Sequence, residues 1–304
     1  MSRFGGSWSE TKLNCVEDYA RRYLQVMHNQ PWANLHYVDA FAGRGKQALT
    51  SEAEPNPDAA KAELLFGSET DRADTEGFLE GSALRGLSAS ASSSRKFDRF
   101  MLIDAHKPSC QELRATIEAE YPEMLDTVEI RCEDANVALK DYLERVDWRA
   151  TRSLVFLDPF GLEVQWSTIE KLANTGACDV WYLFPLGGVI RMMTNSGQVP
   201  DLWRARLDEV FGTPDWYQEF YRATQASLFG DTAALKDAST SHVVDYIRRR
   251  LNTVFPAVSK AGVLRNSKGF PLFALILGVA NPGRPAQEAA LRIGNHLVRR
   301  LSAP

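Results

Sequence analysis

The stretch His36-Tyr-Val-Asp-Ala-Phe-Ala-Gly-Arg-Gly45 decides the fold of this chain. Its apolar first half is typical of a buried strand, and its second half of a tight loop. Glycines after a strand let backbone N–H groups approach a ligand closely. Asp39, at the strand end, can accept a hydrogen bond from a ligand amine or hydroxyl. The stretch therefore predicts a binding loop for a nucleotide-like ligand, with a tight turn that binds nothing as the alternative.

A second stretch, Leu154-Val-Phe-Leu-Asp-Pro-Phe-Gly161, also joins an apolar strand to a polar loop. The Asp158 side chain and the Pro159 carbonyl supply two acceptors for the two hydrogens of a planar amino group. Phe160 can stack on an aromatic base and fix its plane. The loop therefore predicts recognition of an amino group on a ring, against the simpler interpretation of a strand-ending turn with an exposed aromatic.

Around these two stretches, strands and helices alternate along the chain, which indicates a doubly wound parallel α/β sheet. A helix at 10–27 precedes the first strand, and 88–94 is expected to be a loop. Two strands joined by a turn, at 263–264 and 271–280, and a helix at 285–301 end the pattern. The expected strands are 35–40, 97–104, 128–132, 153–157 and 179–184, and the expected helices after the first strand begin near 82, 109, 137 and 166.

The chain is expected to form one domain over 1–304, interrupted by a loop insertion at 46–80 and a helical insertion at 189–255. Its 304 residues carry a net charge of −4, so no overall basic footprint for nucleic acid is present. The four cysteines have no metal-site spacing and are expected to be buried free thiols. No apolar run is long enough to span a bilayer, and no secretion signal is evident, so we expect a cytoplasmic protein without metal or membrane association.

Acidic residues follow the second and third expected strands. Asp104 lies where a nucleoside-binding sheet holds ribose hydroxyls, and Asp134 where a carboxylate can accept from an adenine amino group. The alternatives are a helix cap or a solvated turn for Asp104, and helix capping by the neighbouring Asn136 at the second position. Lys12 is expected either to reach a phosphate or cofactor carboxylate, or to be solvated.

Gly43-Arg-Gly45-Lys-Gln-Ala48 also matches the dinucleotide fingerprint G-x-G-x-x-A. That pattern requires an acidic residue about 20 residues further on, at the end of the next strand. The next convincing strand ends only at Asp104. A nicotinamide-dependent oxidoreductase is therefore the weakest of the alternatives.

The Asp39–Gly45 loop resembles the cofactor motif of class I S-adenosylmethionine (AdoMet)-dependent methyltransferases, and Asp158–Gly161 is similar to the D-P-P-[YF] and D-P-[FY]-G motifs of amino-methylating enzymes. The whole pattern resembles the three-Cys-motif partner protein (TcmP) family, from about Trp8, Lys12 and Tyr19 to the Phe-Pro-Leu-Phe at 270–273. The resemblance implies a Rossmann-like methyltransferase fold, with a seven-stranded, mostly parallel sheet and a terminal antiparallel hairpin. It also implies a three-Cys-motif partner protein.

These observations predict an AdoMet-dependent N-methyltransferase acting on an exocyclic amino group of a nucleobase in DNA or RNA. The expected catalytic residues are Asp158, Pro159 and Phe160. The expected cofactor-binding residues are Asp39, Phe41, Gly43, Gly45, Asp104 and Asp134. The alternative is a non-catalytic or weakly catalytic partner subunit. In that case the aromatic-rich segment 203–221 of the helical insertion is expected to dock another protein. A local basic face that contacts phosphate, or else a solvated helix face, is expected from the arginines of the insertion: Arg191, Arg204, Arg206, Arg222 and the run Arg248–Arg250.

Overall fold

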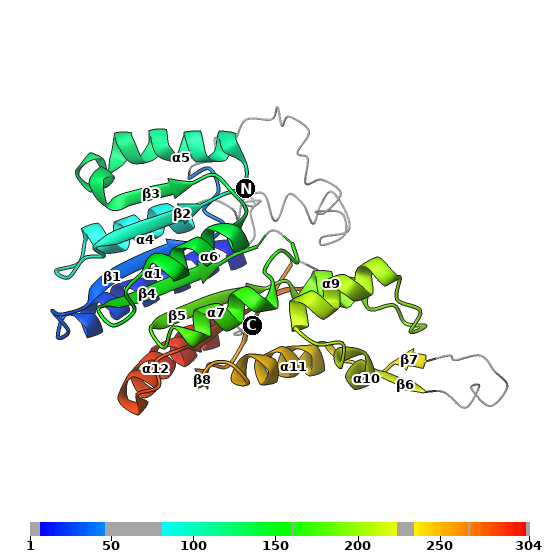
Figure 1. Cartoon of the computed structure of the whole chain (residues 1–304). Helices are drawn as coiled ribbons and strands as arrows, with labels where there is room; N and C mark the ends of the chain where they lie inside the picture. Colours follow the sequence, from blue (N-terminus) through cyan, green and yellow to red (C-terminus); the bar gives the residue numbers. More distant parts are fainter. Residues whose placement is uncertain (1–6, 46–80, 160, 224–233, 267, 302–304) are drawn as a thin grey trace.

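An eight-stranded sheet forms the centre of the protein, seen in a computed structural model that describes residues 7–45, 81–159, 161–223, 234–266 and 268–301 (Figure 1). The strands lie in the order β3-β2-β1-β4-β5-β10-β8, and β9 pairs with β10. Their bounds are β1 Asn34–Asp39, β2 Arg99–Ile103, β3 Val128–Arg131, β4 Thr151–Leu157, β5 Cys178–Phe184, β8 Ala257–Val258, β9 Gly262–Arg265 and β10 Pro271–Val279.

The strands β1 to β5 run parallel to one another, whereas β10 runs antiparallel to its neighbours β5, β8 and β9. The predicted α/β class, the mostly parallel sheet and the terminal antiparallel hairpin are therefore confirmed. The predicted number of seven strands is wrong, because β8 adds an eighth. Two residues are too short a segment to show the alternation of apolar and polar side chains that identifies a strand in a sequence.

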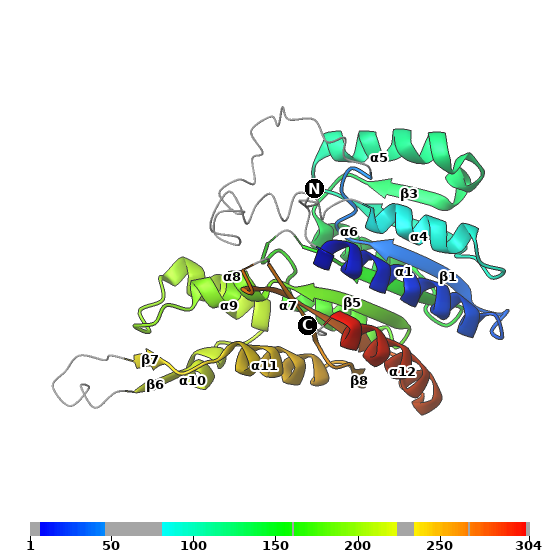
Figure 2. The same cartoon turned by 180° about the vertical axis from the view of Figure 1, so that it is seen from behind.

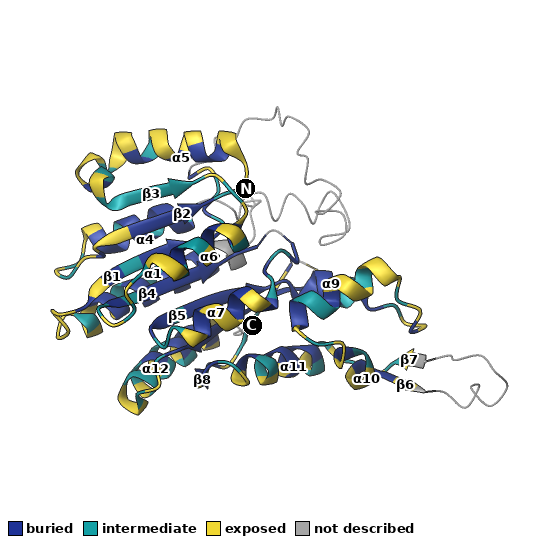
Figure 3. Cartoon of the chain, viewed as in Figure 1, coloured by how far each residue is buried: buried dark blue, intermediate teal, exposed yellow. Residues whose placement is uncertain are grey.

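Helices cover both faces of the sheet. α1 (Ser7–Met27), α4 (Ser82–Ala91) and α12 (Arg284–Leu301) lie together on one face, and α6 (Ala135–Arg145) and α7 (Trp166–Asn174) on the other (Figures 1 and 2). Both faces of the central strands are therefore covered, and β1, β4, β5 and β10 are almost entirely buried (Figure 3). This explains why these strands are near-continuous apolar runs.

The remaining helices border the sheet. α5 (Lys107–Glu120) and a short 3₁₀ helix (Pro122–Thr127) lead from β2 to β3, and α5 lies along the β3 edge (Figure 1). α4 continues to Ala91, so the expected loop at 88–94 is helical over its first half. The serines there did not signal a helix, because serine is a weak helix former.

The insertion between β5 and β8 is only partly helical. It contains α8 (Leu186–Met192), α9 (Asp201–Phe211), α10 (Trp216–Phe220) and α11 (Thr240–Asn252), and also a small antiparallel pair, β6 (Tyr221–Ala223) and β7 (Ala234–Lys236). The insertion predicted at 189–255 therefore contains helices, as expected, and in addition a strand pair that was not predicted. The predicted loop insertion at 46–80 lies outside the described residues.

Aromatic side chains join this insertion to the sheet. The Phe211 ring lies 5.9 Å from Phe184 of β5, 5.2 Å from Tyr246 and 6.0 Å from Phe220, between ring centroids. Phe211 and Phe220 are completely buried. The insertion and the sheet thus share one hydrophobic core.

Gly212, which ends α9, is expected to be intolerant of any side chain. Its φ of 68° lies in the left-handed region, and a Cβ atom there would overlap the Trp166 indole. Backbone strain and overpacking together predict that Gly212→Ala destabilises the protein by about 3 kcal/mol. Gly269→Ala is the matched control, because Gly269 has a φ of 79° and nothing within 4 Å of the added Cβ. Thermal unfolding of the two variants checks this, and equal losses would contradict it.

Candidate functional site

The two motif loops meet at one edge of the sheet. β1 pairs with β2 on one side and with β4 on the other, so successive connections leave β1 in opposite directions. Such a switch point is where open α/β sheets bind ligands, outside the carboxyl ends of the strands. Asp39 is the last residue of β1 and pairs with Phe156, two residues before Asp158. The starts of both loops therefore lie at the same edge of the sheet.

The glycine loop is held between the neighbouring strands. The Ala40 N–H donates to the Phe156 carbonyl of β4 at 3.0 Å, and the Ala42 N–H donates to the Ile103 carbonyl of β2 at 2.8 Å. Gly43 and Gly45 have φ angles of 64° and 85°, which other residues rarely adopt. The loop therefore crosses over the carboxyl end of β1 with a backbone conformation that requires both glycines.

Asp39 is a buried carboxylate with one unused oxygen. Its side chain is completely buried, Oδ1 accepts a hydrogen bond from the Phe41 N–H at 3.1 Å, and Oδ2 has no partner among the described residues. Burial raises the pKa of Asp39 to about 7 and outweighs the nearby Ser82 hydroxyl and the Phe41 N–H, which lower it; the negative charge of Asp158 adds to the rise. The Ser82 hydroxyl is close enough to act on the carboxylate electrostatically, but it does not form a hydrogen bond of normal geometry with Oδ2. Buried polar atoms are nearly always hydrogen-bonded, so the unpaired Oδ2 makes Asp39 a candidate ligand-binding residue.

Asp158 forms a buried ion pair with Lys12 of α1, at 2.6 Å between Lys12 Nζ and Asp158 Oδ2. The two residues are 1% and 5% exposed. The alternative of a solvated Lys12 is therefore wrong, and its partner in the described chain is the Asp158 carboxylate. Lys12 Nζ also lies 5.9 Å from the centre of the Phe156 ring.

Pro159 and Phe160 follow Asp158 in the second motif. Pro159 is buried directly after Asp158. Phe160 lies outside the described residues, so its predicted stacking role is not addressed by the structure.

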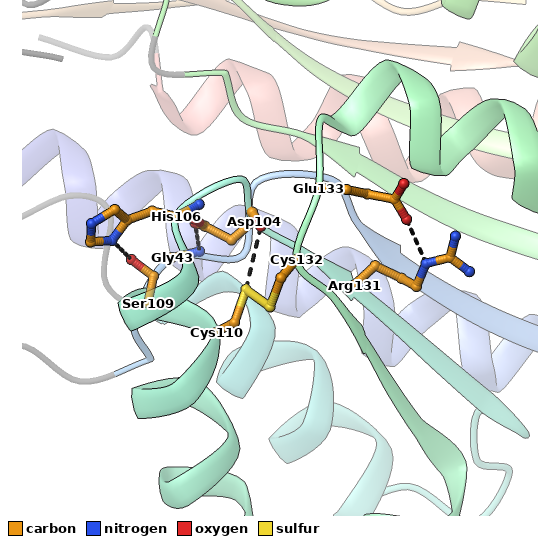
Figure 4. The surroundings of a disulfide bond; sticks show 8 residues. All are labelled: Gly43, Asp104, His106, Ser109, Cys110, Arg131, Cys132 and Glu133. Carbon is orange, nitrogen blue, oxygen red and sulfur yellow. Dashed lines mark hydrogen bonds and ion pairs between the residues drawn. A yellow bond between two sulfur atoms is a disulfide. The ribbon is translucent and has the colours of Figure 1, made fainter. Parts of the chain in front are cut away.

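Asp104 connects the second strand to the glycine loop. Its Oδ2 accepts a hydrogen bond from the Gly43 N–H at 3.0 Å, and its Oδ1 accepts from the His106 N–H at 2.7 Å (Figure 4). Burial raises the pKa of Asp104. Asp104 therefore orders the loop itself, which the sequence did not indicate, and it does so at the position where a ribose ligand was predicted.

Asp134 caps α6. Its Oδ1 accepts hydrogen bonds from the backbone N–H groups of Asn136 and Val137, at 2.9 and 3.2 Å. The capping role that the sequence suggested for Asn136 belongs to Asp134. Asn136 instead fixes the chain after the second motif: its amide donates to the Glu163 carbonyl, and its Oδ1 accepts from the Gln165 N–H and the Thr168 hydroxyl.

The aromatic and basic residues of the insertion serve its own packing. Trp216 and Phe220 are completely buried, so among the aromatics of the segment 203–221 the predicted docking surface is left with the partly buried Trp203 and Tyr217. The expected basic face is also largely engaged: Arg248 donates to the Ser259 carbonyl, and Arg250 donates to the Phe211 carbonyl. Arg249 pairs with Glu219.

Metal sites and membrane-spanning helices are both absent from the described part of the chain. No group of three or more His, Cys, Asp or Glu residues is placed to hold a metal ion there. None of the helices described is long and apolar enough to cross a membrane.

Comparisons with known proteins do not assign the chain to a family. No family model matches it, and no curated protein matches it. Among solved structures, protein LPL1258 from Legionella pneumophila, of the DUF519 family, is similar at 12% identity with a TM-score of 0.45, covering 92% of this chain and 90% of that one. EvdMO1 is similar at 10% identity with a TM-score of 0.31, covering 86% of this chain and 41% of that one. Neither similarity is high enough to indicate a function.

Proposed function

We propose that this protein is an AdoMet-dependent N-methyltransferase acting on an exocyclic amino group of a nucleobase in DNA or RNA. One observation carries the proposal: two buried carboxylates, Asp39 and Asp158, lie at the same switch point of the sheet, and one oxygen of Asp39 has no partner in the described chain. The two motifs that resemble methyltransferase sequences are therefore adjacent, as transfer between two bound molecules requires.

The residues at the glycine loop suit AdoMet, which supplies an electrophilic methyl group when bound. Asp39 Oδ2 is the acceptor for an amine or hydroxyl of the ligand, and the backbone at Phe41, Gly43 and Gly45 allows close approach. Asp104 holds the loop through the Gly43 N–H, and we assign it to the ribose, whose hydroxyl would share an Asp104 oxygen with the loop. Asp134 uses Oδ1 for capping, which leaves Oδ2 for the adenine amino group.

Asp158 and Pro159 would bind the target amino group. The nitrogen lone pair of a nucleobase amine is delocalised into the ring, and acceptors on both N–H bonds favour the tetrahedral geometry needed for attack. Lys12 donates a hydrogen bond to Oδ2 of Asp158 and balances the charge of the carboxylate. Oδ1 would therefore accept one hydrogen of the target amino group. The Pro159 carbonyl would accept the other, and Phe160 would stack on the base. These groups stabilise developing charge by their fixed positions.

Nucleoside mass spectrometry tests the proposed reaction. RNA and DNA from cells with and without the gene should differ in one N-methylated nucleoside, and the wild-type gene should restore it. Identical nucleoside profiles in both nucleic acids, combined with co-purification of a protein partner, would instead support the partner-subunit alternative.

The raised pKa of Asp39 predicts that AdoMet binding depends on pH. Asp39 must be ionised to bind the cationic ligand, and its pKa is about 7 in the ligand-free protein. Affinity should therefore rise up to about tenfold per pH unit below 7 and level off above it. Calorimetric titrations between pH 5.5 and 8.5 measure this, and Asp39→Asn should give a flat profile. A wild-type affinity that falls as the pH rises would contradict the assignment.

A further inference from the structure

Two cysteines lie at the carboxyl edge of β2 and β3, beside the cofactor site proposed above. The structure joins Cys110, in the first turns of α5, to Cys132, which directly follows β3, with 6.2 Å between their Cα atoms (Figure 4). That separation is normal for a disulfide. The prediction of four free thiols is therefore corrected for this pair. A bridge here fastens the start of α5 to the end of β3.

Asp104 lies next to the bridge (Figure 4). Its N–H donates to the Arg131 carbonyl at 3.1 Å, and its side chain accepts from the Gly43 N–H. The Cys110 sulfur lies 3.3 Å from the Asp104 carbonyl oxygen, within reach of a thiol hydrogen bond. A disulfide sulfur has no hydrogen to donate, so Cys110 has two exclusive partners: Cys132 when oxidised and the Asp104 carbonyl when reduced.

The four cysteines differ in reactivity. Cys15 and Cys178 are buried free thiols, and burial raises the pKa of each to about 12, so they hardly form thiolates. Cys132 is exposed, whereas Cys110 is 3% exposed. A thiol in solution can therefore reach the Cys132 sulfur of the bridge.

We propose that the Cys110–Cys132 pair is a redox-responsive clamp on the Asp104–Gly43 contact, and that the bridged form orders the cofactor edge while the reduced form loosens it. The effect of the clamp on AdoMet affinity rests on the proposed function, whereas its effect on the Asp104–Gly43 contact does not.

Opening of the clamp is a thiol–disulfide exchange. A thiolate of a dithiol reductant attacks the Cys132 sulfur, the S–S bond breaks, and its electron pair leaves on Cys110, which takes a proton from water. The second thiol of the reductant then displaces Cys132. The reductant ends as a disulfide, and the two cysteines have gained two electrons and two protons. A low-molecular-weight disulfide such as glutathione disulfide reverses the reaction.

Hydrogen–deuterium exchange on the full chain tests the clamp without any cofactor. The protein is compared after treatment with glutathione disulfide and with dithiothreitol, and peptide mapping without reductant identifies the 110–132 cross-link. The peptide containing Gly43 should exchange more slowly in the oxidised protein. Cys110→Ser/Cys132→Ser should match the reduced protein under both conditions, because the serine hydroxyl can also donate to the Asp104 carbonyl. Cys15→Ala should retain the difference.

AdoMet titrations of the same samples test the link to binding. Affinity should be about tenfold lower in the reduced protein, the size of one hydrogen bond to a charged group. The absence of a 110–132 cross-link, or equal exchange at Gly43 in both states, would overturn the clamp. Equal AdoMet affinities would overturn its link to the cofactor. AdoMet binding to neither state, with the exchange difference present, would overturn the proposed function while leaving the clamp.

Discussion

Asp39→Asn is expected to weaken AdoMet binding roughly ten- to a hundredfold while making the ligand-free protein more stable at pH 8. The first effect is the loss of a hydrogen bond and charge contact at Oδ2, typically about 1.5–3 kcal/mol. The second follows from burial, which moves the pKa of Asp39 from 3.8 to about 7. The folded protein favours the neutral form of Asp39. The stability that this form contributes to the fold is therefore fully present below pH 4 and is lost as the pH rises through 7.

The size of the stability gain follows from the same shift. Roughly three pKa units at about 1.4 kcal/mol each give an upper limit near 4 kcal/mol for the gain at pH 8. Asp179→Asn is the matched control, since Asp179 is also buried, with a pKa that burial raises to about 6, but lies near the start of β5 and accepts a hydrogen bond from Tyr19. It should leave AdoMet affinity unchanged. Calorimetry and thermal unfolding measure both effects, and intact affinity in Asp39→Asn would contradict the site.

Asp158→Asn is expected to lower the rate of methyl transfer by about a hundredfold or more, while AdoMet still binds. The asparagine offers an N–H donor where the target amine needs an acceptor. It also leaves the Lys12 ammonium buried without a counter-ion, which should destabilise the protein by about 3–5 kcal/mol. Transfer of tritiated methyl groups from AdoMet to total RNA and DNA from cells lacking the gene measures activity.

A double variant separates catalysis from folding in that experiment. Lys12→Met/Asp158→Asn removes both members of the ion pair, so most of the lost stability should return. Transfer should stay lost and AdoMet binding should stay intact. Measurable transfer by the stable double variant would remove Asp158 from the catalytic site.

The positions of Asp39 and Asp158 were accessible from sequence because both follow strong apolar strands. Parallel strands place their carboxyl ends at one edge, so two strand-end acids are close whenever their strands are neighbours. The order of β1 and β4 was the uncertain step, and the structure places them side by side. The glycines were equally informative, since both have a positive φ.

The contacts that complete the site carry no local signal. Lys12 and Asp158 are 146 residues apart, and nothing in the first helix marks its lysine as buried. The Cys110–Cys132 pair depends on the adjacency of β2 and β3, which is a property of the sheet and not of cysteine spacing. Asp134 did carry a usable signal: an acidic residue just before a helix is a favoured N-cap. The capping role was instead predicted for its neighbour Asn136.

Titration of the wild-type protein with AdoMet by calorimetry at pH 8 tests the central claim most directly. At this pH Asp39 is mostly ionised, and the proposal predicts saturable binding of one AdoMet per chain, lost or strongly weakened in Asp39→Asn and unchanged in Asp179→Asn. No heat of binding at millimolar AdoMet, in either the oxidised or the reduced protein, would contradict the assignment of this edge of the sheet as a cofactor site.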